Sequence, residues 1–506
     1  MNKTTSLFLF ILIMLFQWSC HLPKTVTNTI KFTVLQLNDV YEISPLEGGK
    51  KGGLARVATL KKELLKENPN TISVLSGDFL SPSLIGMQKD VDGKKIAGKQ
   101  MVEALNAMGL DYATFGNHEF DIKDPDLLQE RIDQSDFLFV CSNAFRNQRE
   151  GKIAPFTQKG KAIPPYVFRE FSNPLGDKIK LGITGVLLPF NKQKYVNYTP
   201  VEEALRVAAE EMKSQSDVMV AMTHLAIDED MKMAKKVEDY VLFLGGHDHV
   251  NMKHKVGTTV ITKADANAKT VYIHRFSYNL KSGKLDLRSE LRKIDESLAD
   301  ESSTQQVVKR WESKVEGIVE RMGYSIDSEI FTAKQPLICT EAKIRSEQTN
   351  FGTLSVLACE KVIPMADAYF INSGSMRLDD NLSGVITEYD ILRVFPYGGP
   401  IVKMELPGDV LNTVLDAGLE RNRGEGGFLQ NLHISKSSDG KWLIKNQPLN
   451  IKKKYTVVMP KFLASGKEAN LGLLANYTFQ SFDNFDGIEN DIRDIVIAYM
   501  KEKQHD

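Results

Sequence analysis

Short apolar runs alternate with amphipathic stretches from residue 30 to about residue 293. The runs are rich in β-branched residues, which is typical of strands buried on both faces. Between them, residues 54–66 and 201–214 carry apolar side chains at helical spacing, and Pro200 suits a helix start. This alternation predicts an α/β layered domain. Buried strands are expected at residues 30–37, 71–75, 137–141, 179–186, 218–222 and 241–244.

A polar segment over residues 302–322 follows this region. Its valines and Ile318 recur at roughly helical spacing, which predicts a helix that links two domains. The rest of the chain mixes helical and strand-like patterns and predicts a second, smaller α/β domain. We expect helices there at residues 352–362 and 408–419 and strands at 368–371, 402–406 and 455–459. The expected borders are 25–295 for the first domain, 296–323 for the linking helix and 324–506 for the second domain.

The first 20 residues differ from the rest in pattern. Lys3 precedes an apolar run over residues 7–16, which is typical of an export signal and too short to span a bilayer. Ser19-Cys20 after that run resembles a bacterial lipobox, which predicts a lipid anchor on Cys20 and a place in the periplasm or cell envelope. The alternative is a plain secretory signal in which Cys20 is incidental.

Composition narrows the class of protein. The chain has 506 residues, a formal net charge of −1 and 25% charged residues, as in an ordinary soluble globular protein. A net charge near zero implies no broad polyanion-binding face, so no nucleic-acid polymer is expected as a partner. Three further cysteines make a disulfide framework improbable: Cys141 is expected in the core, while Cys339 and Cys359 could pair.

Polar clusters stand at the ends of predicted strands. The most informative is Gly116-Asn117-His118-Glu119, followed by Asp121. Each cluster alone has an ordinary explanation as a turn or a polar cap, but ligands in layered α/β domains lie beyond the carboxyl ends of the strands. Several clusters in that position therefore predict one shared site. The other members are Asn38-Asp39, Gly77-Asp78, Thr223-His224 and Gly246-His247-Asp248-His249.

These side chains suit a pair of divalent metal ions. Mixed carboxylate, amide and imidazole donors favour Zn, Mn, Fe or Co over Ca. Two such ions can clamp a phosphoryl group and ionise a water for in-line attack. Asp78 is a candidate bridging ligand, since a lone buried carboxylate is otherwise costly. His118 would face away from Asn117 on an extended segment, so it suits a general acid or phosphate contact that Asp121 orients.

Together the motifs resemble the 5'-nucleotidase family, whose calcineurin-like metallophosphoesterase domain precedes a nucleotidase-specific domain. The resemblance implies a β-sandwich flanked by helices, hydrolysis of nucleotide phosphate esters, and a second domain that swings to carry substrate to the metals. It implies that His118 and Asp121 form the catalytic pair. It also implies one ion held by Asp39, Asp78 and His249, and another held by Asp78, Asn117, His224 and His247.

The second domain carries segments that resemble the family's substrate contacts. Asn372, Gly374 and Arg377 match an Asn-x-Gly-x-x-Arg segment that contacts phosphate. Arg345 resembles a second phosphate arginine, and Phe428 matches the ring that stacks on the nucleobase. An arginine fork suits phosphate because it binds two oxygens at once.

The sequence departs from the family at two places. Tyr41 stands where an imidazole ligand is usual, and it could ligate as a phenolate or pack nearby and leave water in that position. Asn470 stands where the family has the second ring of its base clamp, and Phe482 or Phe485 could substitute for that ring. Loss of one stacking partner would change base preference.

These observations favour an exported two-metal phosphohydrolase that acts on nucleoside monophosphates or another small phosphoester. Among enzymes, the alternative is a UDP-sugar pyrophosphatase or a 2',3'-cyclic-nucleotide phosphodiesterase with 3'-nucleotidase activity. A surface binding protein with a degraded metal site is the alternative outside them, supported by Tyr41 and Asn470.

Overall fold

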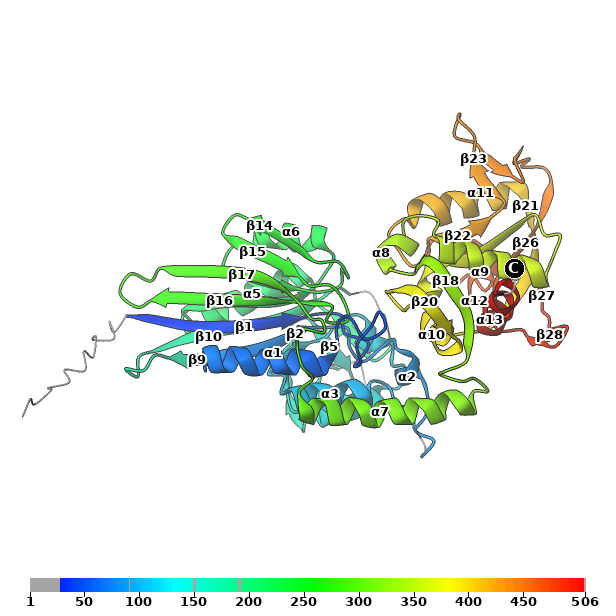
Figure 1. Ribbon diagram of the computed structural model, residues 1–506. Helices are drawn as coiled ribbons and strands as arrows, with labels where there is room; N and C mark the ends of the chain where they lie inside the picture. The colour runs from blue at the N-terminus through cyan, green and yellow to red at the C-terminus, as the bar shows by residue number, and fades with distance from the viewer. Residues whose placement is uncertain (1–27, 91, 149–151, 190–192, 505–506) are drawn as a thin grey trace, which may run out of the picture.

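A computed structural model describes residues 28–90, 92–148, 152–189 and 193–504. The predicted export signal and Cys20 lie outside these ranges. Within them, no helix combines the length and the apolar character needed to cross a membrane. The ribbon shows two domains side by side, with α8 (Glu341–Ile344) and β20 (Asn381–Thr387) of the second domain turned towards the end of the first (Figure 1).

The first domain is a sandwich of two six-stranded sheets. Apolar side chains from both sheets meet between them, and Phe32 stacks on Phe171 of the other sheet and Phe276 of its own, with ring centroids 4.6 and 4.4 Å apart. The predicted α/β class, a sandwich with flanking helices, is therefore confirmed. The first sheet runs β17 (Leu285–Lys293), β16 (Thr270–Asn279), β1 (Thr29–Leu37), β2 (Thr71–Ser76), β3 (Tyr112–Thr114) and β4 (Leu138–Phe139); the second runs β14 (Met252–Val256), β15 (Thr259–Lys263), β13 (Leu242–Gly245), β12 (Val218–His224), β10 (Lys178–Leu187) and β9 (Tyr166–Ser172).

Parallel pairing brings the functional strand ends together. β1, β2, β3 and β4 run parallel in the first sheet, and β10, β12, β13 and β15 run parallel in the second. Because parallel strands end at the same edge of a sheet, the loops that follow them gather at one end of the sandwich.

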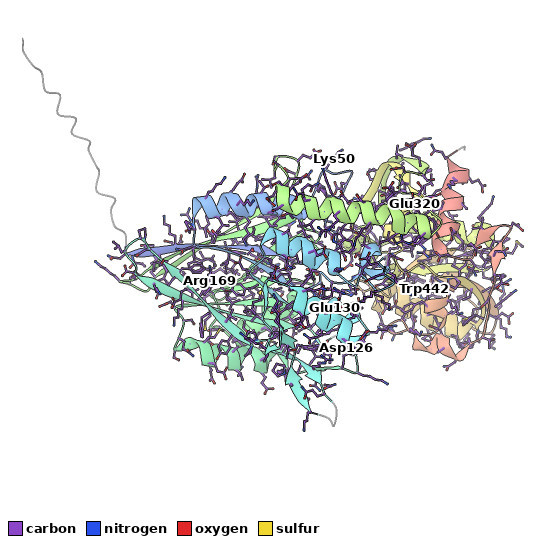
Figure 2. All side chains as sticks on the ribbon, turned by 90° about the horizontal axis from the view of Figure 1, so that it is seen from below. Lys50, Asp126, Glu130, Arg169, Glu320 and Trp442 are labelled. Atoms are coloured by element: carbon purple, nitrogen blue, oxygen red, sulfur yellow. The ribbon has the colours of Figure 1, made fainter. Side chains whose placement is uncertain are left out.

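The helix α7 (Ser302–Arg321) belongs to the helical layer of the first domain and also leads into the second. Its apolar stripe packs beside α1 (Leu54–Glu67) and α3 (Lys99–Met108). Trp311 is fully buried there and donates its indole N–H to Glu103 at 2.8 Å. Figure 2 shows Glu320, near the end of α7, beside the second domain. The packed stripe makes α7 a rigid spacer, so any hinge would lie beyond its C-terminal end.

The second domain is built on a five-stranded sheet. Helices α9 (Asn350–Val362) and α13 (Ile492–Lys503) pack in one apolar cluster, and α11 (Gly408–Asp416) packs in another. Cys339 and Cys359 are separate buried thiols, so the pairing that their sequence allowed is wrong. The sheet runs β22 (Leu429–Leu432), β19 (Ala368–Asn372), β26 (Lys454–Pro460), β21 (Ile401–Pro407) and β27 (Phe479–Gln480).

Candidate metal centre between the two domains

His224 lies at the middle of the converging strand ends. Its Nε2 is 3.1 Å from Asp78 Oδ2, 3.2 Å from Asn117 Oδ1 and 4.0 Å from Asp39 Oδ1. The ring of His247 lies 5.4 Å from the ring of His224, and His249 Nε2 lies 3.5 Å from Asp39 Oδ1. The structure therefore brings all six predicted metal ligands into one cluster, in which His247 and His249 are partly covered and the other four are buried.

The backbone at this cluster adopts conformations that side-chain-bearing residues rarely use. Asp39, Asp78 and His247 have φ angles of +52°, +57° and +76°. Left-handed backbone of this kind costs free energy and persists where the surrounding structure demands it. Gly116 permits the close approach of two loops, because a Cβ there would lie 2.2 Å from Asp78 Oδ1.

The donor set fits a divalent cation. Asp39 Oδ1 is buried and accepts no hydrogen bond, which is costly unless a cation or water satisfies it. Ligand atoms of Asp39, Asp78 and His224 all lie within 4.8 Å of one another. His224 Nδ1 lies 2.7 Å from the Ser76 carbonyl, to which it donates, so Nε2 is the nitrogen that faces the cluster and would give its lone pair to a cation that replaces its proton.

Charges in the cluster point to the same conclusion. Burial lowers the pKa of His224, but Asp78 and Asp39 outweigh burial and raise that pKa to about 9. Burial opposes ionisation of Asp78, yet His224 and His118 hold its pKa well below the usual range. Burial and the neighbouring His224 lower the pKa of His247 to about 3. The two carboxylates thus stabilise one positive charge in their midst, which is what a bound cation would supply.

His118 and Asp121 form a hydrogen-bonded pair at the mouth of the cluster. His118 Nδ1 lies 2.7 Å from Asp121 Oδ2, and the guanidinium of Arg377 lies 3.0 Å from His118 Nε2. The expectation of an extended segment here is wrong: Asn117 is helical in φ and ψ, and a 3₁₀ turn covers His118–Asp121. The turn still separates the two side chains, because the 3₁₀ geometry rotates successive residues about its axis.

Tyr41 occupies the place of the usual imidazole. Its hydroxyl lies 3.2 Å from Asp78 Oδ2 and 3.2 Å from His249 Nε2. Burial, Asp78 and Asp39 raise the pKa of the Tyr41 phenol well above its ordinary value. The hydroxyl donates to Asp78 and lies beside His249, so it is close enough either to pack against the predicted ligands or to join them.

Two arginines of the second domain reach this site with a carboxylate between them. Arg345 lies 2.7 Å from Glu341 Oε2, and Arg377 lies 3.9 Å from the same oxygen. The two residues expected beside Arg377 in the phosphate segment have structural contacts of their own. Asn372 donates to Glu468 at 2.8 Å, and Gly374 donates its backbone N–H to Gly426 at 2.7 Å.

The expected base-stacking region is more polar than a two-ring clamp. Phe428 is 4% exposed, and the Arg423 guanidinium lies over its ring at 5.7 Å. Asn470 donates its side-chain amide to Asn422 at 2.7 Å. Phe482 and Phe485 contact each other as tilted rings, with centroids 5.3 Å apart, beside the other apolar cluster of the domain and away from the cluster that holds Phe428, so neither replaces the missing ring.

Sequence reasoning gave no role to Glu119, although the residue stands inside the most informative motif. Its fully buried carboxylate accepts hydrogen bonds from the backbone N–H groups of Asp78, Phe79, Leu80 and Gly116. We call this set of four hydrogen bonds the Glu119 clamp. Its only signal in the sequence was an acidic residue two positions after the predicted ligand Asn117. Sequence reasoning also missed Glu341, the first residue of α8, and Asp379, which lies on a loop of the second domain; neither belongs to a motif.

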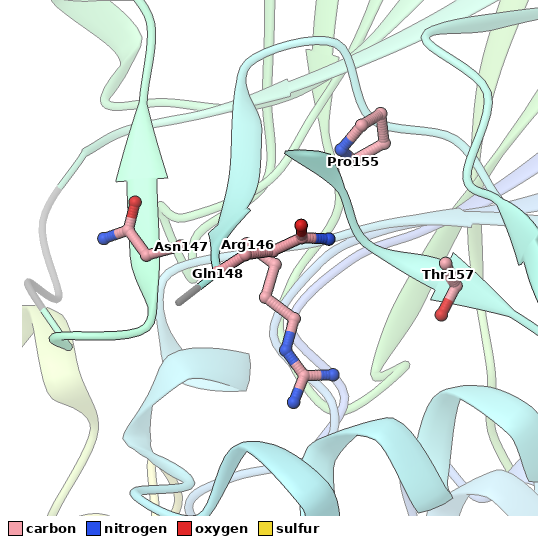
Figure 3. Close-up of a pocket in the computed structure, with 5 residues that line it drawn as sticks. All are labelled: Arg146, Asn147, Gln148, Pro155 and Thr157. Carbon is pink, nitrogen blue, oxygen red and sulfur yellow. The ribbon is translucent and has the colours of Figure 1, made fainter. Parts of the chain in front are cut away.

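A separate surface hollow of about 340 Å³ lies elsewhere on the first domain (Figure 3). It contains none of the candidate ligands. Its lining residues are Arg146, Asn147, Gln148, Pro155 and Thr157.

Comparisons with known proteins agree with the geometry. Residues 32–251 match the calcineurin-like phosphoesterase family, and residues 329–472 match the 5'-nucleotidase C-terminal domain. The 5'-nucleotidase of Homo sapiens is 22% identical over 504 residues, covering 86% of this chain and 83% of that protein. The trifunctional nucleotide phosphoesterase protein YfkN of Bacillus subtilis is 24% identical over 420 residues, covering 74% of this chain but only 27% of that longer protein.

Two solved structures share the fold over nearly the whole chain. A 5'-nucleotidase precursor from Thermus thermophilus has a TM-score of 0.73 at 19% identity, covering 94% of this chain and 97% of that one. The sulfate thiohydrolase SoxB from Thermus thermophilus has a TM-score of 0.67 at 14% identity, covering 93% and 94%. At these identities the structures establish the fold alone.

Proposed function

Since the chain belongs to the 5'-nucleotidase family, with a calcineurin-like phosphoesterase domain followed by a nucleotidase C-terminal domain, we propose that it is a two-metal phosphohydrolase that releases phosphate from nucleoside monophosphates. The observation that supports this proposal most strongly is spatial. Candidate metal donors of the first domain meet Arg377 of the second, which lies 3.0 Å from His118. A phosphate that displaced this contact would lie between the guanidinium and the metal donors.

We assign one ion to Asp39, Asp78 and His249, and the other to Asp78, Asn117, His224 and His247. The oxygen and nitrogen donors suit Zn, Mn, Co or Fe. When bound, the two ions supply charge neutralisation for the phosphoryl oxygens and lower the pKa of water.

The protein's own groups bind the phosphate and move a proton. Arg377 and Arg345 would grip phosphate oxygens through their guanidinium forks. Asp121 holds Nδ1 of His118 at 2.7 Å, which leaves Nε2 directed at the pocket. In this structure Nε2 accepts a hydrogen bond from Arg377 at 3.0 Å, so Arg377 must turn to the phosphate before His118 acts. A His118 that carries a proton on Nε2 as well would then hydrogen-bond the phosphate and pass that proton to the leaving oxygen.

The residues expected to contact the leaving group also suit a second class of substrate. Asn470 binds Asn422 instead of presenting a ring, and Glu468 binds Asn372 at 2.8 Å. A polar wall of this kind also suits a leaving group richer in hydroxyls, such as a nucleotide sugar. We propose AMP-type monophosphates first and UDP-sugar or 2',3'-cyclic-nucleotide hydrolysis second.

A substrate panel tests the proposal. Purified protein would be assayed with AMP, UDP-glucose and 2',3'-cyclic AMP in the presence of each divalent ion, with His118→Ala as the matched inactive control. Fastest turnover of AMP supports a 5'-nucleotidase, and fastest turnover of either other substrate selects the second candidate. Fewer than one ion per chain, with no turnover of any substrate, would favour the binding-protein alternative.

We also propose that the protein is exported and held at a membrane through Cys20. The support is the pattern of residues 1–20 alone. Cys20→Ser should move the protein from the membrane fraction to the soluble fraction; an unchanged distribution contradicts the anchor.

A further inference from the structure

His249 touches both domains through its two ring nitrogens. Its Nε2 faces the first domain, 3.5 Å from Asp39 Oδ1 and 3.2 Å from the Tyr41 hydroxyl. Its Nδ1 faces the second domain, 3.0 Å from Asp379 Oδ2. A candidate metal ligand of one domain is therefore hydrogen-bonded to a carboxylate of the other.

Asp379 is held firmly in this position. Its side chain is 7% exposed, and its Oδ1 accepts the backbone N–H of Glu341 at 2.8 Å. Its carbonyl oxygen accepts a hydrogen bond from Lys269 of the first domain at 2.8 Å. Its φ of +51° is a strained conformation that places the carboxylate against His249.

A carboxylate behind a histidine ligand has a known physical effect. It fixes the tautomer with the proton on the nitrogen it contacts, so the other nitrogen presents its lone pair to the metal. It also fixes the ring orientation and increases the basicity of the ligand. With the proton on Nδ1 facing Asp379, the lone pair on Nε2 points at Asp39 and the ion assigned to that side.

We propose that Asp379 positions His249 for metal binding, so that docking of the second domain completes one half of the metal centre. This inference rests on the proposed two-metal function. The loop that carries Asp379 also brings Arg377 to His118, so one domain movement assembles a metal ligand and a phosphate contact together. By linkage, an ion that binds the docked form more tightly must favour docking by the same factor.

The chain offers a matched pair of variants. Asp379→Asn keeps the shape of the side chain but removes the nearer of the two carboxylate charges behind His249, while Glu341 Oε1 stays 3.5 Å from the same Nδ1. Asp380→Asn is the control, because Asp380 also joins the domains, accepting the Glu47 backbone N–H at 3.1 Å, and neither of its contacts involves His249. Asp379→Glu restores a carboxylate and should recover part of any loss.

The readout is metal affinity, measured by calorimetric titration of the full chain with Mn²⁺ and by the visible absorption of Co²⁺. We expect Asp379→Asn to weaken one of the two ions about 10–100-fold and to change the Co²⁺ spectrum, with the other ion retained. Asp380→Asn should keep both affinities. X-ray scattering should show compaction of the wild type on addition of metal and less compaction of Asp379→Asn.

Two results would overturn the inference while leaving the proposed function intact. One is wild-type affinity for both ions in Asp379→Asn. The other is an equal loss in Asp380→Asn, which would mean that docking matters but the carboxylate does not. A wild-type chain that binds no divalent ion would instead refute the proposed function, and this inference with it.

Discussion

The Glu119 clamp allows the sharpest quantitative prediction. Its carboxylate accepts four backbone N–H groups at 2.6–3.0 Å and lies beneath the loops that carry Asp78 and Asn117. One oxygen serves Phe79 and Leu80, and the other serves Asp78 and Gly116. The substitution Glu119→Gln preserves the volume but replaces one acceptor oxygen with a donor NH₂ group.

The cost follows from the bonds that are lost. Glutamine can satisfy only one of the two N–H pairs, so two charge-assisted hydrogen bonds disappear. At about 1.5–3 kcal/mol each, these bonds set an upper bound of about 3–6 kcal/mol on the fall in the free energy of unfolding of the first domain. Burial raises the pKa of Glu119, so a neutral glutamine recovers part of that loss by avoiding the cost of a buried charge. That loss is a large part of the roughly 5–15 kcal/mol by which domains are stable. The amide would also push the Asp78 loop away and weaken metal binding.

Urea unfolding followed by the fluorescence of the buried Trp311, in a chain whose Trp18 and Trp442 are replaced by phenylalanine, measures the first effect, and metal titration measures the second. Glu301→Gln is the matched control: Glu301 also accepts backbone N–H groups, at 3.1 and 2.8 Å, but it caps α7 outside the pocket. It should cost about 1 kcal/mol and spare metal affinity. A Glu119→Gln protein within about 1 kcal/mol of wild type, with unchanged metal affinity, would refute the clamp.

Further predictions concern chemistry, binding and pH. His118→Ala should lower turnover about 10²–10⁴-fold while the metal content measured by atomic absorption stays the same. Arg377→Ala should raise KM for AMP more than it lowers kcat in steady-state assays, because it removes a phosphate contact. Excess chelator should abolish hydrolysis and added Mn²⁺ should restore it; activity that survives chelation contradicts the mechanism. Burial lowers the pKa of His274 from 6.5 to about 3, so the unfolded chain takes up the proton first and stability falls as pH drops below 6.5. His274→Gln should flatten this fall, which urea midpoints at about pH 7 and about pH 4.5 would measure.

The strands that sequence predicted best are those buried on both faces. β1, β2, β10, β12 and β13 take part in parallel pairs, and most of their residues are buried and apolar, so their bounds differ from the prediction by only a residue or two. β16 and β17 form an antiparallel pair at the edge of the first sheet and were not predicted. β17 alternates between partly covered and exposed residues, a pattern shared with solvated loops and polar helices.

The residues of the candidate site also fall into two groups, those that the sequence predicted and those that it did not. Asp39, Asp78 and His247 follow parallel strands, so their convergence could be expected from the edge that those strands share. Asp379 could not be found in this way, because it reaches His249 only through the packing of two domains, 130 residues apart along the chain. The hydrophobic pattern of a sequence predicts helices, strands and the edge where parallel strands end. It does not predict a contact between two domains, because that contact depends on how their surfaces fit together.

Glu341 changes how the phosphate arginines should be understood. Its carboxylate already occupies the fork of Arg345 at 2.7 Å, and Arg345 and His249 outweigh the cost of burying it, so its pKa stays below the usual value. A phosphate that binds Arg345 must therefore take over a charge-assisted contact, and the exchange of one anion for another gains little net free energy at that residue. Arg377 lies 3.9 Å from Glu341 and 3.0 Å from His118, so its ion pair with Glu341 is weaker than that of Arg345. If the proposed function holds, Arg377 and the metal ions would supply most of the affinity for phosphate, while Arg345 and Glu341 would select for a ligand with enough charge to displace a carboxylate.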